Sequence, residues 1–341
     1  IKAQHEKIKF KDKKAANKVI IKTKGKKAFV KSIKKSTQNQ QPPFPFDLTT
    51  LQTEAYRTLG MQPKETLVHA QSLYSSGYIS YPRTSSQKLP QQLGLKKILG
   101  KLAKQTPYLK LVNQLLEKPN LKPNEGKKTD AAHPAIHPTG EVPKRLTGRK
   151  ASVYDLVVRR FLATFAEHAK RETVTLNIDV NKEIFIAKGT RTVEPGWHTY
   201  YGRFAKFKEE ELPKTQEGDE VKVKKITLDE KETQPPKRYT PASIIKQMES
   251  LNIGTKSTRA AIVDALAERN YISGTSLEAT GLGIKTIDTL KKYCPDIIDV
   301  KLTKDIELDL EKIQLGKKKE DTILKEAKTI LNKIVKEFKQ N

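Results

Sequence analysis

Gly77-Tyr78-Ile79-Ser80-Tyr81-Pro82-Arg83-Thr84-Ser85 is the stretch from which the fold and the chemistry of this chain can be worked out. Its position after a helical pattern, and its aromatic and branched residues, predict a strand. Side chains two residues apart on a strand share a face, so the Tyr81 phenol and the Arg83 guanidinium can reach one phosphate. A tyrosine that attacks phosphorus needs such a cation, because the ordinary pKa of a phenol is about 10. The stretch predicts a nucleophilic tyrosine, although a structural tyrosine at a strand end fits the same few residues.

Two helical patterns precede this strand, at residues 47–59 and 63–77. Two short helices followed by a strand predict a winged-helix-like unit. A second pair of helical patterns, within 240–269, leads into an aromatic strand at Tyr271 and resembles the first loosely. Two related helix-turn-helix modules would be a common scaffold for binding nucleic acid.

The composition is strongly basic. The 341 residues include 66 Lys and Arg against 39 Asp and Glu, which gives a formal charge of +27. A polyanionic partner is expected, and nucleic acid fits best. No stretch approaches the roughly 20 apolar residues of a spanning helix, and no basic segment carries an apolar amphipathic face, so we expect no membrane partner. A lysine-rich protein background would produce part of the same charge.

Cysteine usage limits the covalent and metal chemistry. Cys294 is the only cysteine, which excludes an internal disulfide and a cysteine-based zinc site within this chain. A packed thiol in a reducing cytoplasm is the expectation. The sequence opens at Ile1 in the middle of a pattern, and we expect it to be part of a longer protein.

The predicted fold class is multidomain α+β, with mainly helical domains, winged-helix-like modules and a β-rich hinge domain. Residues 12–24 read as a helix and 28–33 as a strand, and a proline run at 42–45 closes this part. Further patterns predict an amphipathic helix at 152–168, whose stripe is core, a β-rich region at 172–230, and helices at 240–254, 257–269, 282–293 and 320–338.

A second candidate segment is Ala132-His133-Pro134-Ala135-Ile136-His137-Pro138-Thr139. Two histidines four residues apart could share a metal on a helix, but the two prolines prevent that helix. No cysteine or carboxylate completes a set of ligands, so we expect no metal here. A histidine can instead donate a hydrogen bond to phosphate near neutral pH, and packing explains His137 equally well.

A third candidate segment runs from Arg238 to Tyr271. Small hydroxyl residues at a helix start, here Ser257 and Thr258, can present backbone N–H groups to phosphates. We expect positive charge from three further residues, Lys256, Arg259 and Arg269. Ordinary helix capping, which assigns Ser257 as the cap, and surface charge would explain the same residues.

Two other clusters have plainer interpretations. The carboxylates Asp305, Glu307, Asp309 and Glu311 resemble a metal cluster in print, but residues two apart on a helix face different ways, so we expect them to be solvated. The aromatic residues Trp197, Tyr200 and Tyr201 could stack on bases, and packing of the β-rich region is the preferred interpretation.

The segment from Leu73 to Pro90 resembles the active-site segment of type IA DNA topoisomerases in its archaeal form. The resemblance implies that Tyr81 forms a 5′-phosphotyrosyl link to one DNA strand, that Arg83 assists it, and that Tyr78 is structural. The histidine segment resembles that family's histidine loop, which implies that His133 bonds the scissile phosphate.

The third segment resembles the part of these enzymes that holds single-stranded DNA beside the cut, which implies DNA-binding roles for Lys256, Ser257, Thr258, Arg259 and Arg269, with His137 as a further candidate. Some members carry an arginine where Thr255 stands, so that contact is in doubt here.

Domain boundaries and cofactors also follow from the resemblance. It implies that 1–45 and 172–236 form the two parts of a hinge or arch domain, that 46–171 is the tyrosine domain, and that 237–341 belongs to a helical domain for single-stranded DNA. The Toprim domain, which binds Mg²⁺ in the family, has no counterpart in this sequence and would act in cis or as a separate chain. We therefore expect this part alone to bind single strands without relaxing DNA.

The resemblance implies an isomerase of the cytoplasm and nucleoid that relaxes negatively supercoiled DNA, by bending of the hinge domain and passage of a strand. A phosphotyrosine conserves the bond energy, so no ATP is expected, and the chain has no Gly-x-x-x-x-Gly-Lys loop. Two alternatives stay open. One is the topoisomerase module of a reverse gyrase, and the other is a non-catalytic single-stranded-DNA-binding protein.

Overall fold

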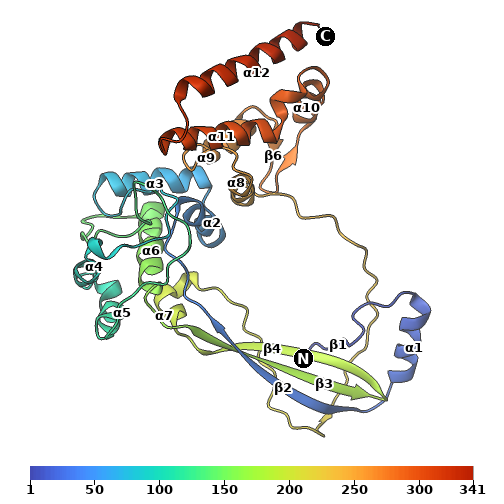
Figure 1. The fold of residues 1–341 in the computed structure, drawn as a ribbon. Coiled ribbons are helices and arrows are strands. Elements are labelled where there is room, and N and C mark those ends of the chain that lie inside the picture. The colour runs from blue at the N-terminus through green and yellow to red at the C-terminus, as the bar shows by residue number, and fades with distance from the viewer. Residues whose placement is uncertain (341) are drawn as a thin grey trace. The chain divides into compact units, whose positions relative to one another are not determined.

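A computed structural model describes residues 1–340, which divide into two compact units. The sheet unit consists of Ile1–Pro43 with Ala163–Pro235, and the helical unit consists of Phe44–Leu162 with the residues from Pro236 onward (Figure 1). Each unit is therefore assembled from two separate stretches of chain. The assignment of these stretches to hinge, tyrosine and strand-binding domains stays a prediction.

Three long antiparallel strands form the centre of the sheet unit. The strand order is β1-β4-β3-β2-β5. Its elements are β1 (Gln4–His5), α1 (Lys13–Thr23), β2 (Ala28–Gln40), β3 (Ala169–Val180), β4 (Glu183–Glu194), α7 (Trp197–Tyr201), the 3-10 turn Gly202–Phe204 and β5 (Glu220–Val221). The predicted helix at 12–24 and the predicted strand at 28–33 are confirmed as α1 and β2. Asp12 caps α1 by accepting a hydrogen bond from the backbone of Ala15.

The pairing of β2 with β3 joins the two stretches of the sheet unit. Their register runs from Ala28 opposite Val180 to Gln40 opposite Ala169, with one irregularity near Val30. In Figure 1 this appears as the blue β2 beside the green β3 and β4. Apolar side chains on one face make a small core of Ala28, Leu176, Ile178, Val180 and Ala187.

The aromatic residues after β4 pack inside the sheet unit. Trp197, Tyr200 and Tyr201 are 7%, 9% and 2% exposed. The Trp197 indole donates to the carbonyl of Gln40 at 3.1 Å, and its ring lies 5.8 Å from that of Phe207. The packing interpretation of these aromatics is confirmed.

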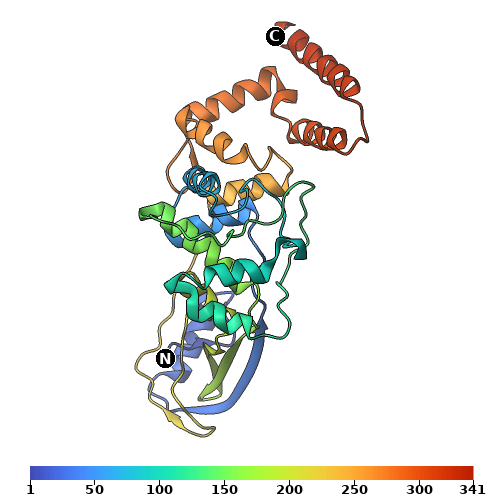
Figure 2. The ribbon, with the colours of Figure 1, turned by 90° about the vertical axis from the view of Figure 1, so that its left-hand side faces the viewer.

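The first stretch of the helical unit is a set of helices around α6. These are α2 (Leu48–Leu59), α3 (Pro63–Ser75), the 3-10 turn Gln91–Leu93, α4 (Leu95–Leu102), α5 (Thr106–Leu116) and α6 (Gly148–Ala163). The predicted apolar stripe is buried, with Val157 and Leu162 fully enclosed. The paired helices α4 and α5, teal in Figures 1 and 2, were not predicted, because both are short and their apolar patterns run directly into a proline-rich stretch.

The predicted strand at 77–85 was wrong as a regular strand. Only Ile79 makes a bridge, antiparallel to Pro138. Backbone hydrogen bonds flank this bridge, with Ser80 N donating to the His137 carbonyl at 2.8 Å. Pro82 cannot donate to a ladder, which helps to explain why the pairing stops.

The second stretch of the helical unit contains α8 (Pro241–Ser250), α9 (Arg259–Glu268), β6 (Ile272–Ser273), β7 (Glu278–Ala279), α10 (Gly281–Tyr293), the 3-10 turn Pro295–Ile298, α11 (Val300–Gln314) and α12 (Glu320–Gln340). The predicted helices are confirmed, and the β6–β7 hairpin follows α8 and α9 as a wing would. No such hairpin follows α2 and α3 in residues 1–340, so the winged-helix interpretation stays a prediction.

Two smaller expectations concern the C-terminal helices. Cys294 is buried, as a packed thiol should be. On α11, Asp305 and Glu311 are exposed as expected, whereas Glu307 and Asp309 are half-buried, and Asp309 pairs with Lys312 and Lys318 at 2.8 and 2.7 Å. Among the described residues, no helix is both long enough and apolar enough to cross a membrane.

Candidate active site

Tyr81 and His133 lie against each other in the helical unit. Their ring centroids are 4.5 Å apart, with planes inclined by 48°. The bridge at Ile79 holds their two segments together, because Thr139 N also donates to the Tyr78 carbonyl at 3.1 Å. Both side chains are half-buried, which leaves part of each open to solvent. The structure thus brings together two residues that are 52 positions apart in the sequence.

Helix α3 contacts both Tyr81 and Arg83. The Tyr81 and Tyr74 rings form a T-shaped pair with centroids 5.2 Å apart, and Arg83 Nε donates to Gln71 Oε1 at 3.4 Å. Gln71 and Tyr74 are three residues apart on α3 and hence share a face. Although the regular strand is missing, the phenol and the guanidinium are both held along one side of one helix.

Thr84 is a fully buried connection between the tyrosine segment and the histidine loop. Its hydroxyl donates to the His133 carbonyl at 3.2 Å and accepts from Ser86 N at 3.0 Å. The Thr84 carbonyl accepts from Leu48 N at the start of α2. The hydroxyl at position 84 is therefore committed to structure.

Asp130 connects the same two segments through its carboxylate. Oδ1 accepts from the backbone N–H groups of Ala132 and His133 at 3.1 and 3.2 Å. Oδ2 accepts from both the N–H and the hydroxyl of Ser85, at 3.0 and 3.1 Å. The Lys256 ammonium, from the third candidate segment, binds Oδ2 as well. Sequence reasoning did not single out this residue, because its partners are distant in the sequence.

The environment of Asp130 keeps it ionised. Burial of its side chain, which is 5% exposed, would raise the pKa. The hydrogen bonds from Lys256, Ser85 N and Ala132 N outweigh that effect and hold the pKa far below its ordinary value. A fixed negative charge therefore lies beside the Tyr81–His133 pair at neutral pH.

The turn before α9 corrects one prediction for Ser257 and Thr258. The N-cap of α9 is Thr258, not Ser257, and its side chain makes no capping hydrogen bond. Thr255 accepts hydrogen bonds from three backbone N–H groups, of Ser257, Thr258 and Arg259, at 3.1–3.2 Å. The N–H groups expected to receive phosphate are thus already satisfied within the turn. Any role of these residues in binding DNA stays a prediction.

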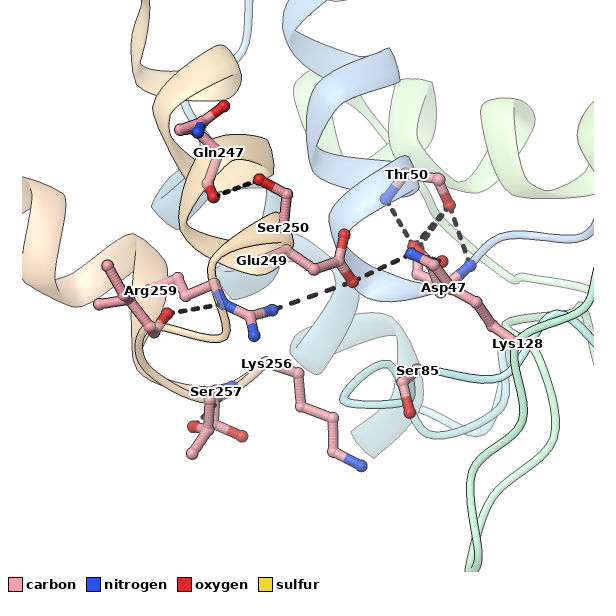
Figure 3. A network of polar contacts seen from close by, with 12 residues as sticks. Asp47, Thr50, Ser85, Lys128, Gln247, Glu249, Ser250, Lys256, Ser257 and Arg259 are labelled. Carbon is pink, nitrogen blue, oxygen red and sulfur yellow. Dashed lines mark hydrogen bonds and ion pairs between the residues drawn. The ribbon is translucent and has the colours of Figure 1, made fainter. Parts of the chain in front are cut away.

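Arg259 is largely buried within a chain of ion pairs. Its guanidinium group donates to the Ile253 carbonyl at 3.1 Å and lies 3.9 Å from Glu249, while its side chain is only 11% exposed. Burial lowers its pKa despite the nearby carboxylates. Figure 3 shows Glu249 between Arg259 and Lys128, whose Nζ is 3.0 Å from Glu249 and 3.1 Å from Asp47. This location favours a structural role for Arg259 over direct contact with DNA.

Asp47 anchors the other end of this network. It caps α2 by accepting from Thr50 N at 2.7 Å, and its second oxygen accepts from Gln87 Nε2 at 3.0 Å. Gly126 packs against the Gln87 side chain, and a Cβ at position 126 would lie 1.9 Å from Gln87 Oε1. The Asp47-x-x-Thr50 pattern could have predicted the cap, whereas the contacts to Gln87 and Lys128 leave no local signal.

The structure places the remaining two candidates in opposite environments. His137 is 5% exposed, with Nδ1 2.8 Å from the Ala135 carbonyl, and burial lowers its pKa. This favours packing over a DNA contact. Arg269, at the end of α9, is exposed and has no carboxylate partner among residues 1–340.

No group of three or more His, Cys, Asp or Glu side chains that could hold a metal ion occurs in the described part of the chain. Magnesium is ordinarily bound by one or two carboxylates together with waters and substrate phosphates. The binding of Mg²⁺ by a domain outside this sequence therefore stays a prediction.

Comparison with known proteins places this site in a family. Residues 1–325 match the family model for DNA topoisomerase. DNA topoisomerase 1 of Pyrococcus horikoshii is 45% identical over 99% of this chain and 50% of its own length, and that of Methanocaldococcus jannaschii is 50% identical over 100% and 45%. Full-length topoisomerase I of Thermotoga maritima has a similar structure, with a TM-score of 0.74 and 26% identity over 97% of this chain and 56% of that one.

The chain therefore belongs to the type IA DNA topoisomerase family. It spans about half the length of the curated relatives that it matches.

Proposed function

We propose that this chain supplies the tyrosine that cuts and rejoins one DNA strand. The Tyr81 oxygen attacks a backbone phosphorus, the new O–P bond forms, and the bond from phosphorus to the 3′ oxygen breaks. The phenolic proton is lost and the leaving 3′ oxygen gains a proton, so the products are a 5′-phosphotyrosyl link and a free 3′-OH. Attack by that 3′-OH reverses the step without ATP, because the phosphotyrosine conserves the bond energy. The contact of Tyr81 with His133 at 4.5 Å is the observation that carries the proposal.

His133 and Arg83 are proposed to bind the scissile phosphate. The His133 imidazole lies on the Tyr81 ring, so a phosphate within reach of the phenol is also within reach of this donor. Arg83 is held on α3 by a long hydrogen bond of 3.4 Å to Gln71, the only one its side chain makes within residues 1–340. Two charge-assisted bonds to a phosphate would compete well with that contact.

The metal and the substrate belong to the proposal for the whole protein. We propose that Mg²⁺ is bound by a Toprim domain outside this sequence, in cis or as a separate chain. The proposed substrate is negatively supercoiled DNA with single-stranded character, bound with the help of the net charge of +27. The 341-residue chain by itself should bind single strands and fail to relax a plasmid.

Trapping of a covalent adduct tests the proposal. An oligonucleotide labelled at its 3′ end is mixed with this chain, Mg²⁺ and the Toprim domain of a relative, and the protein is then denatured. The label should stay on the protein, because Tyr81 retains the 5′ phosphate of the downstream fragment. Tyr81→Phe should abolish the adduct. Tyr78→Phe is the matched control and should retain it, since that ring packs 6.4 Å from Tyr154.

His133→Ala should slow adduct formation by about 10²-fold or more, the usual loss when one hydrogen-bond donor to the developing charge is removed. An unchanged adduct with Tyr81→Phe would refute the proposal. Single-strand binding with no adduct from any variant would instead indicate a non-catalytic binding protein.

A further inference from the structure

The Lys256 ammonium is held in place with donors to spare. Its only partner among residues 1–340 is the Asp130 carboxylate, and its side chain is 36% exposed. An ammonium group has three N–H donors, so two remain for another acceptor. Asp130 in turn has four further donors, from Ser85, Ala132 and His133. The carboxylate would therefore stay in place if the lysine also bound something else.

The position of this pair relates it to the proposed cleavage site. Asp130 Oδ1 accepts from His133 N at 3.2 Å, and the His133 ring contacts Tyr81. Lys256 comes from the turn between α8 and α9, outside both of those segments. One carboxylate thus fixes a cation of the third segment beside the first two.

We propose that Asp130 is a positioning residue for DNA, which holds the Lys256 ammonium where it contacts a phosphate of the single strand lying at Tyr81 and His133. This inference rests on the proposed function. Without Asp130, the four-carbon side chain of Lys256 would have to be ordered by the DNA itself, at a cost in binding. The carboxylate acts through Lys256 and touches no DNA.

The opposite possibility is that Asp130 competes with DNA for Lys256. It predicts a change in DNA affinity of the opposite sign when Asp130 is replaced. Removal of a negative charge near a polyanion should tighten binding if charge alone matters, or if Asp130 blocks Lys256. Removal of a positioning residue should weaken it. The sign of the change in affinity therefore separates the two.

The experiment measures binding of a single-stranded oligodeoxythymidylate to the 341-residue chain by fluorescence anisotropy at several salt concentrations. Asp130→Asn should weaken binding by about fivefold, the effect of freeing one long side chain. Lys256→Met should weaken it at least as much and lower the salt slope by about 0.7, the loss of one phosphate contact. Asp130→Asn should lower the slope by a similar amount, although the lysine is still present. The double variant should bind no more weakly than Lys256→Met.

Asp264→Asn is the matched control, because Asp264 pairs with Lys64 at 2.9 Å in the same unit. It should leave binding unchanged or slightly tighter. If Asp130→Asn does not fold, Asp130→Glu keeps the charge but displaces it by one methylene, and it should also weaken binding.

Equal or tighter binding by the folded Asp130 variants, or weakening that simply adds to that of Lys256→Met, would overturn the inference alone. Failure of the unaltered chain to bind single strands would overturn the proposed function with it.

Discussion

Asp47 and Lys128 form an ion pair with an Oδ2–Nζ distance of 3.1 Å in which the acid is buried and the base is not. The Asp47 side chain is 1% exposed and that of Lys128 is 42% exposed. Burial would lower the Lys128 pKa, but the charges of Asp47 and Glu249 outweigh burial and raise it. Since Asp47 also caps α2 and binds Gln87, the stability of this region should depend far more on the acid than on the base.

Asp47→Ala should lower the free energy of unfolding by about 2–4 kcal/mol, because it removes a helix cap and leaves the buried Gln87 amide without its acceptor. Lys128→Met should cost about 1 kcal/mol or less, as expected for a half-exposed pair. Urea unfolding followed by circular dichroism measures both. Asp12→Ala, which removes the exposed cap of α1, is the matched control and should cost about 1 kcal/mol. Equal losses from the two aspartate variants would contradict the role of the buried network.

The buried His137 should make the helical unit sensitive to acid. Burial lowers its pKa in the folded chain, so below the ordinary histidine pKa of about 6.5 the unfolded chain binds the additional proton. The contribution of His137 to the free energy of unfolding is therefore fully present above that pH. It is lost as the pH falls, with a slope of at most about 1.4 kcal/mol per pH unit.

Thermal unfolding between pH 7.5 and 5 should show this slope reduced in His137→Gln. The same substitution at His198, whose pKa is lowered by burial and by Arg171, should affect the transition of the sheet unit instead. An identical pH slope with and without His137 would be the contrary result.

Arg259 and Arg269 should respond differently to the same substitution. Arg259→Met leaves the Ile253 carbonyl without a donor, and it should lower the free energy of unfolding by about 1–3 kcal/mol. Arg269→Met should leave stability unchanged, because this side chain is exposed. If Arg269 contacts phosphate, its loss should lower the salt slope of single-strand binding by about 0.7. A stable Arg259→Met with a reduced slope would show instead that the buried arginine reaches DNA.

The sequence allowed prediction of most helices, because these depend on local patterns, whereas the roles of the tyrosine and histidine segments were implied by resemblance and stay predictions. Pro241 at a helix start and the apolar stripe of α6 are signals that can each be recognised within a short stretch of sequence. The resemblance implied only that Tyr81 and His133 act on the same phosphate, and the contact between their rings has no signal in the sequence near either residue.

The polar network was largely beyond prediction. Asp130 accepts hydrogen bonds from Ser85 and Lys256, which lie 45 and 126 residues away in the chain. Such a carboxylate looks like ordinary surface charge in the sequence. The predicted cap of α9 was wrong for a different reason. Thr255, not Ser257, accepts the local hydrogen bonds, and propensity does not distinguish between two neighbouring hydroxyl residues.

The sheet unit is assembled from two stretches of chain that are far apart in the sequence, and this affects how it can fold during translation. Strand β2 leaves the ribosome well before β3, because the whole stretch from Phe44 to Leu162 is translated between them. During that interval its backbone donors and acceptors are unpaired, which is the situation that invites pairing with a strand of another nascent chain. Three exposed lysines on β2, Lys31, Lys34 and Lys35, oppose such pairing by charge repulsion. The positive charge of this strand would then protect the nascent chain from aggregation, in addition to attracting a polyanionic partner.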